Sequence, residues 1–138
     1  MQKGHEEKVE AVTKLALQFL AEVIGQCPAG LENSTNPDIA YAVVGFQYGA
    51  VESAAHIAGL GEKSSAAVVE DVLLRINGMS KETGSRFLAV MPTLAQKEYP
   101  PIGIGGRAII SYYNSTTDEE KMSAASSLQA ILRQIDES

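Results

Sequence analysis

The sequence predicts an all-α fold, a compact bundle of five or six helices with the second helix at its centre. Apolar residues recur at helical spacing along most of the chain, between stretches rich in turn-forming residues. Aromatic residues make up only 6% of the chain and Trp is absent, so the core must be aliphatic and rich in alanine, which favours helices over strands. At 138 residues, 45% of them hydrophobic and 20% charged, the chain fits a single folded domain over residues 1–138.

Residues 6–24 form the first predicted helix. Its apolar residues repeat at helical spacing, and acidic residues cluster at its start, where they suit the positive end of the helix dipole. Gly25, Pro28 and Gly30 end the helix and lead into a polar, turn-like connection over residues 31–36.

The second predicted helix covers residues 37–60 and has two unlike faces. Asn36-Pro37-Asp38 is a strong start signal, because it combines an N-cap residue, a proline at the first helical position and an early acid. One face is apolar and consists of Ile39, Val43, Phe46, Ala50, Val51, Ala54 and Ile57. The opposite face carries small and ionisable residues, namely Asp38, Tyr41, Ala42, Gly45, Gly49, Glu52, Ser53 and His56.

Two further helices follow in the middle of the chain. Ser64 or Ser65 is expected to cap the third helix, which Asn77-Gly78 closes through the left-handed conformation that glycine permits. Ser80 is expected to cap the fourth helix, and Pro92 should bend or break it because proline removes an amide donor.

The region from residue 99 to residue 114 is less regular. A Pro/Gly-rich loop is predicted near residues 99–106, after Tyr99-Pro100-Pro101. Residues 107–114 are rich in β-branched and aromatic side chains, so both a helix and a strand remain open, and helix is favoured because a lone strand would lack a pairing partner.

The last predicted helix has the clearest start. Thr117 and Glu120 match a capping box, in which Glu120 reaches back to the amide of Thr117. One apolar stripe follows, made of Ala124, Leu128, Ile131 and Ile135.

The small-residue face of the second helix is the main candidate for a partner or a ligand. Its residues are Tyr41, Ala42, Gly45, Gly49, Glu52, Ser53 and His56. Each glycine costs on the order of 1 kcal/mol in a helix interior, so a glycine pair on one face suggests that something needs the space. Three interpretations stay open: a neighbouring helix that crosses closely, a self-association or partner surface, and a bound small ligand. Gln47 lies near the middle of the apolar face and would need hydrogen-bond partners if buried.

Glu52 and His56 lie four residues apart and therefore on one helix face. Such a pair can share a metal ion or a proton, and antiparallel packing of the first two helices would bring His5 and Glu6 level with it. His5, Glu6, Glu52 and His56 are thus the metal-ligand candidates. An exposed pair on a solvated helix face explains the same residues more simply, and no established helical metal motif is present, so we expect no metal site.

Gly103, Gly105, Gly106 and Arg107 resemble an anion-binding loop that leads into a helix. The signal is weak, because the lysine and hydroxyl residues of a phosphate-binding loop are missing, and a plain turn after Pro100-Pro101 accounts for the glycines.

Composition restricts the other function classes. The net charge of −6 disfavours nucleic acid, and no apolar run approaches the roughly 20 residues that span a bilayer. Cys27 is the single cysteine and lacks the spacing of a zinc site, and the polar N-terminus is not a signal peptide, so we expect a cytoplasmic protein. We expect no catalytic residues and no cofactor, because the common nucleophile and deaminase motifs are missing.

Together these observations predict a non-enzymatic, soluble protein-interaction domain: an adaptor, a regulator or an immunity-like protein that binds itself as a homodimer or binds one protein partner. In size and acidity the chain is similar to bacterial immunity proteins, secretion chaperones and small regulators. Residues 92–114 form a second candidate surface, as an ordered projecting loop. The alternative is a small-ligand or metal-binding helical protein, with or without enzymatic activity, that uses the face of Glu52 and His56.

Overall fold

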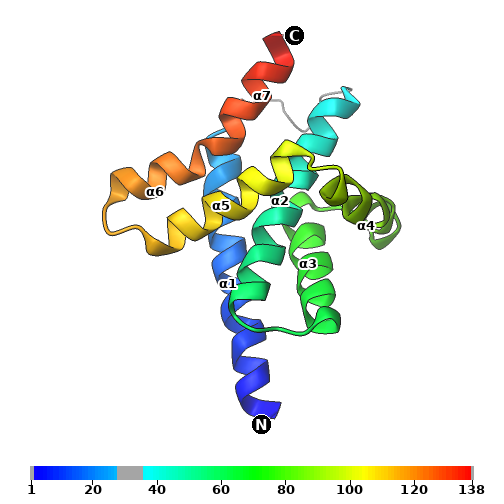
Figure 1. Cartoon of the computed structure of the whole chain (residues 1–138), viewed down its shortest axis with the longest axis vertical. Coiled ribbons are helices and arrows are strands. Elements are labelled where there is room, and N and C mark those ends of the chain that lie inside the picture. The colour runs from blue at the N-terminus through cyan, green and yellow to red at the C-terminus, as the bar shows by residue number, and fades with distance from the viewer. Residues whose placement is uncertain (1, 28–35, 138) are drawn as a thin grey trace.

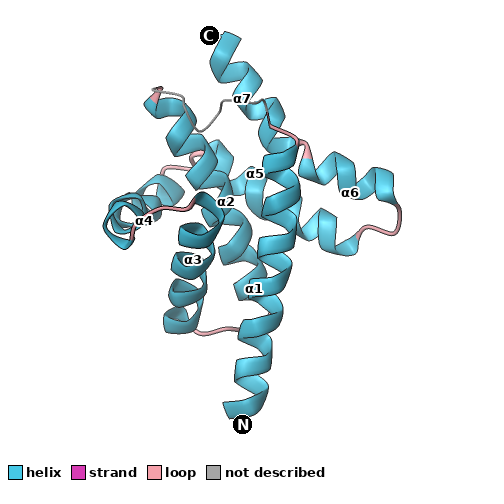
Figure 2. Cartoon of the chain, turned by 180° about the vertical axis from the view of Figure 1, so that it is seen from behind, coloured by secondary structure: helices cyan, strands magenta, loops and turns pink. Residues whose placement is uncertain are grey.

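The computed structural model describes residues 2–27 and 36–137, and these residues are almost entirely helical (Figures 1 and 2). Their helices are α1 (Gln2–Gly25), α2 (Pro37–Ile57), α3 (Glu62–Asn77), α4 (Lys81–Gln96), α5 (Pro100–Asn114), α6 (Asp118–Ala125) and α7 (Ser127–Glu137). The all-α class is confirmed. The expected five or six helices agree with the structure when α6 and α7, which only Ser126 separates, are taken as one interrupted helix.

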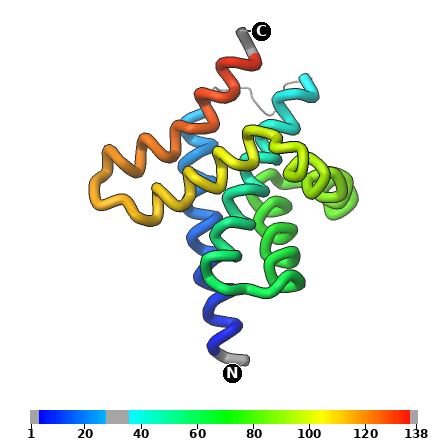
Figure 3. The backbone as a smooth tube through the Cα atoms, viewed as in Figure 1, coloured from blue at the N-terminus to red at the C-terminus, as the bar shows by residue number. Residues whose placement is uncertain are grey.

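Helix α2 lies at the centre of the bundle, as predicted, and packs against α1, α3, α4, α5 and α7. Helix α1 runs along the back of the molecule, and α5 crosses α2 diagonally on the opposite side (Figures 1 and 3). The start of α1 and the end of α7 lie at opposite ends of the molecule. Helices α5 and α6 form a hairpin that projects to one side.

The helix ends follow the local signals in most places. The side chain of Asn36 accepts a hydrogen bond from the Asp38 amide (2.9 Å), and Ser80 caps α4 by accepting from the Thr83 amide (3.2 Å). Gly78 closes α3 with φ +60°, as predicted. The predicted cap of α3 is wrong: the helix already begins at Glu62 after Gly61, so both candidate serines lie within its first turn.

Two other local predictions are refined by the structure. Thr117 caps α6 by accepting a hydrogen bond from the Glu120 amide, but the Glu120 carboxylate accepts from the amide of Thr116 (3.1 Å) rather than from that of Thr117. Helix α4 continues through Pro92 to Gln96, so the proline does not break it.

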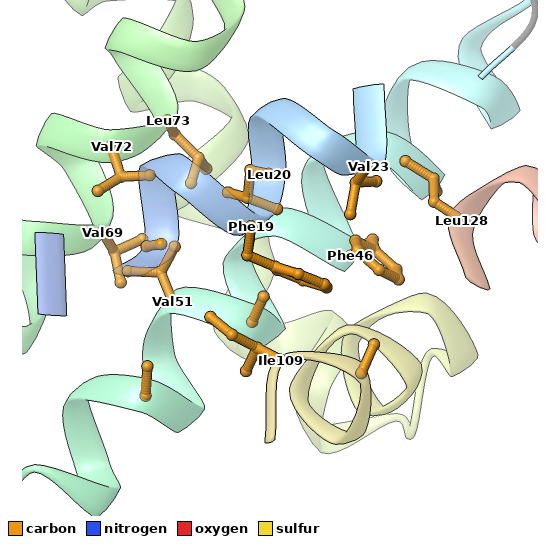
Figure 4. Close-up of a cluster of buried hydrophobic side chains, with 14 of the residues drawn as sticks. Phe19, Leu20, Val23, Phe46, Val51, Val69, Val72, Leu73, Ile109 and Leu128 are labelled. Atoms are coloured by element: carbon orange, nitrogen blue, oxygen red, sulfur yellow. The ribbon is translucent and has the colours of Figure 1, made fainter. Parts of the chain in front are cut away.

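The core joins α1, α2 and α5 through aromatic side chains. The ring of Phe19 in α1 stacks on Phe46 of α2 with centroids 6.2 Å apart, and it contacts Tyr112 of α5 at 5.0 Å. Phe19, Phe46 and Ile109 are grouped at the centre of the buried cluster (Figure 4). The remaining buried side chains are mostly Val, Leu and Ala, as the composition predicts.

The predicted Pro/Gly-rich loop near residues 99–106 is wrong, because α5 begins at Pro100 and continues to Asn114. Two prolines are tolerated in the first helical turn, where an amide donor is not needed. The glycines that suggested a loop instead allow a close helix crossing. The preference for a helix over residues 107–114 is confirmed.

At this crossing the backbones of α2 and α5 touch each other. A Cβ atom on Gly49 would overlap the carbonyl oxygen of Ile102 and lie 2.7 Å from its carbonyl carbon. A Cβ atom on Gly105 would overlap the carbonyl oxygen of Phe46 and lie 2.8 Å from its carbonyl carbon. Each helix thus contributes one glycine that the other helix's backbone requires.

Gln47 is fully buried and hydrogen-bonded, which agrees with the requirement stated for it. Its Nε2 donates to Asn77 Oδ1 (3.0 Å), and Asn77 Nδ2 donates to Gln47 Oε1 (2.6 Å) and to the Leu73 carbonyl (2.9 Å). This reciprocal amide pair fixes the end of α3 against the middle of α2.

We predict that Gly105→Ala destabilises the protein by at least about 2–3 kcal/mol, because the new methyl group would force the two backbones apart. Gly103→Ala, two residues away, is the matched control. Its methyl group would meet only the end of the exposed Arg107 side chain at 3.3 Å, so it should stabilise α5 by up to about 1 kcal/mol. Urea unfolding curves of both variants test the pair, and equal effects would contradict the close crossing.

Asn77→Ala should cost about 1–3 kcal/mol, because it leaves the buried Gln47 amide without hydrogen-bond partners. Gln47→Met should cost less, since Asn77 is only half-buried and keeps its bond to the Leu73 carbonyl. Thermal unfolding of the two variants measures the difference, and the reverse order of stability would refute this account.

Candidate functional site

Helix α5 covers the small-residue part of the predicted partner face on α2. Ala42, Gly45 and Gly49 are buried, and the Tyr99 ring lies 3.1 Å from the position of a Cβ on Gly45. Close crossing by a neighbouring helix, one of the three open interpretations, accounts for both glycines.

The remaining residues of that face stay accessible. Tyr41 packs edge-on against Phe87 of α4 with ring centroids 5.5 Å apart, and it is still partly exposed. Glu52 and His56 are exposed, and Ser53 is half-buried beside Gly106. Only Tyr41, Glu52, Ser53 and His56 of the predicted face can therefore meet another molecule directly.

The predicted anion-binding loop is not a loop. Gly103, Gly105, Gly106 and Arg107 all lie within α5, where helix hydrogen bonds engage the amides after the first turn. Gly105 and Gly106 are moreover buried against α2. The free amides that an anion site needs are missing from this segment, because the first turn of α5 begins with two prolines.

The four metal-ligand candidates do not converge. His5 is exposed and shares a hydrogen bond with Ser64 of α3, from Nε2 to Oγ at 2.8 Å. Within residues 2–27 and 36–137, no three His, Cys, Asp or Glu side chains are grouped so that they could hold a metal ion. Glu6 and the Glu52–His56 pair thus do not combine with His5 into a ligand set.

Glu52 and His56 instead line a long groove, which we call the acidic groove. It has a volume of about 1100 Å³ and lies between α2, α3 and α4, with Ile110 of α5 at one edge. One wall is a stripe of α2 made of Tyr48, Glu52, Ser53, His56 and Ile57. The facing wall is a stripe of α3 made of Glu62, Ser65, Ala66, Val69 and Glu70, whose spacing places them on one helix face.

The electrostatics of the acidic groove are one-sided. Glu52, Glu62 and Glu70 line it, and no Lys or Arg does among the described residues. Burial and a hydrogen bond with Glu52 raise the pKa of the Tyr48 hydroxyl, so this phenol stays protonated at neutral pH. Tyr48 is therefore poorly suited to act as a general base at neutral pH.

A second surface, the apolar patch, lies between α1, α2 and α5. It includes Ala11, Leu15, Ala54, Ile57, Ile110 and Tyr113 and surrounds a depression of about 380 Å³. Tyr113 is 71% exposed, Ile57 66% and Ile110 37%, and no charged side chain lines the depression among the described residues. Ile57 and Ile110 line both the patch and the groove, so the two surfaces are continuous.

Several of these residues were not predicted as site residues. Ile57 was assigned to the core face of the second helix, yet α2 ends there and leaves its side chain largely exposed. Ile110 and Tyr113 belong to the predicted second surface, residues 92–114, but they project from a helix and not from a loop. Glu62 and Glu70 carried no signal, because an acidic residue on a helix surface is common.

Comparison of the chain with protein-family models, with curated proteins and with solved structures gives no match. Within the part of the chain that the structure describes, no helix is both long enough and apolar enough to cross a membrane.

Proposed function

We propose that this protein is a non-enzymatic interaction domain that associates with a second copy of itself through the apolar patch. The supporting observation is the exposure of Ile57 and Tyr113, at 66% and 71%, beside an uncharged depression. Large apolar side chains that cluster on the surface of a folded domain are typical of a protein–protein contact. A tyrosine in such a cluster supplies much contact area at a low entropic cost.

A second copy is the occupant that the charge distribution favours. The chain carries a net charge of −6, so most of its surfaces would repel a copy of themselves. The apolar patch brings no carboxylate to the contact among its described lining residues. A two-fold arrangement would bury Tyr113 of each copy in or near the other copy's depression.

Tyr113→Glu should weaken the dimer at least about tenfold, because it places a charge in the desolvated contact. Ile57→Gln should act in the same direction without any change in charge. Native mass spectrometry and sedimentation over a range of protein concentrations measure the dimer fraction.

Met122→Glu is the matched control, since Met122 is also an exposed large hydrophobic residue, 52% exposed, but lies on α6 outside the patch. It should leave the dimer fraction unchanged. A wild-type chain that remains monomeric at every concentration, or equal weakening by Met122→Glu and Tyr113→Glu, would overturn the proposal. The same spectra test the ligand-binding alternative, which requires a bound mass that His56→Ala removes.

A further inference from the structure

Apart from Ile57 and Ile110, the residues that line the acidic groove do not line the apolar patch. Its walls are stripes of α2 and α3, and Leu88 and Pro92 of α4 close one side. A groove of this volume, open to solvent along two helices, is large enough to receive side chains from another polypeptide.

The floor of the acidic groove is apolar. Leu60 and Val69 of the lining are buried and Leu88 is half-buried, and we call these three side chains the floor of the groove. An occupant that covers these side chains must present apolar groups to them.

Three carboxylates line the walls of the groove, and His56 lies beside Glu52 on the α2 wall. Glu62 and Glu70 are eight residues apart, which separates them by about 12 Å along α3. Glu52 faces them from α2, and none of the three forms an ion pair with Lys, Arg or His within the described chain. The groove thus combines three carboxylates that form no ion pair among the described residues with a set of apolar side chains.

We propose that the acidic groove binds a basic amphipathic helix of a partner protein, with the apolar face of that helix on the floor and its lysines or arginines beside Glu52, Glu62 and Glu70. Helix-in-groove recognition uses apolar anchors at i, i+3, i+4 and i+7, and such a helix carries its charges along both margins of the apolar stripe. A small cation would satisfy the walls but leave the floor without a partner. A neutral apolar helix would cover the floor but gain nothing from the carboxylates.

The test uses a fluorescently labelled helical peptide of about 18 residues, composed only of Leu, Lys and Ala, with all Leu residues on one face. Two peptides serve as comparisons: one has Glu in place of Lys, and the other has the same composition with the Leu residues scattered around the helix. Fluorescence anisotropy should show binding of the first peptide only, and its affinity should fall as the salt concentration rises.

The double variant Glu62→Gln/Glu70→Gln should weaken binding of the basic peptide at least tenfold and reduce its salt dependence. Glu10→Gln/Glu119→Gln removes the same number of charges from exposed positions on α1 and α6 and should leave the affinity within about twofold. Leu88→Gln should weaken binding without changing the charge, which separates the role of the floor from that of the walls.

Three results would overturn the inference: no binding of the basic peptide, equal binding of the peptide with scattered leucines, or equal weakening by the two double variants. The substitutions distinguish the two proposals, because Glu62, Glu70 and Leu88 do not line the apolar patch. A dimer that Tyr113→Glu disrupts and Glu62→Gln/Glu70→Gln leaves intact would show that the two proposals succeed or fail separately.

Discussion

The fold depends on the direct contact between the backbones of α2 and α5. Gly49 of α2 and Gly105 of α5 each lie against a carbonyl group of the opposite helix. No side chain therefore separates the two helices at this point. The contact places Ile109 and Tyr112 in the core, while Ile110 and Tyr113, one residue further along the helix, are directed outward. The crossing also positions Ile110 of α5, which lines both candidate surfaces.

Local signals in the sequence were sufficient for most helix boundaries. Helix ends of this kind are set by interactions within a few residues of the chain, so they can be predicted without knowing the fold. Examples are the caps at Asn36, Ser80 and Thr117 and the left-handed Gly78. The error over residues 99–106 has the opposite cause. The many glycines and prolines of this segment favour a loop when only local sequence is considered. The contact between the backbones of α2 and α5 overrides this local preference.

The site was less predictable than the fold. The small-residue face of α2 was correctly marked as a place of close approach, but whether the approaching surface belongs to the same chain is a question of long-range packing. Glu52 and His56 were singled out by their i, i+4 spacing, whereas their facing residues on α3 follow from how two helices are placed side by side. Ile57 fits a helical apolar stripe and is nevertheless exposed. Periodicity identifies the apolar face of a helix but not where the neighbouring helices stop covering that face.

The position of Ile57 and Ile110 at the shared edge of both surfaces has a thermodynamic consequence. A side chain buried against one bound molecule is no longer available to another, so the two proposed binding events would oppose each other. By linkage, dimerisation would lower the affinity of the groove by the same factor by which a bound helix lowers the stability of the dimer. The concentration of the protein itself would then regulate partner binding, and dilution would free the groove.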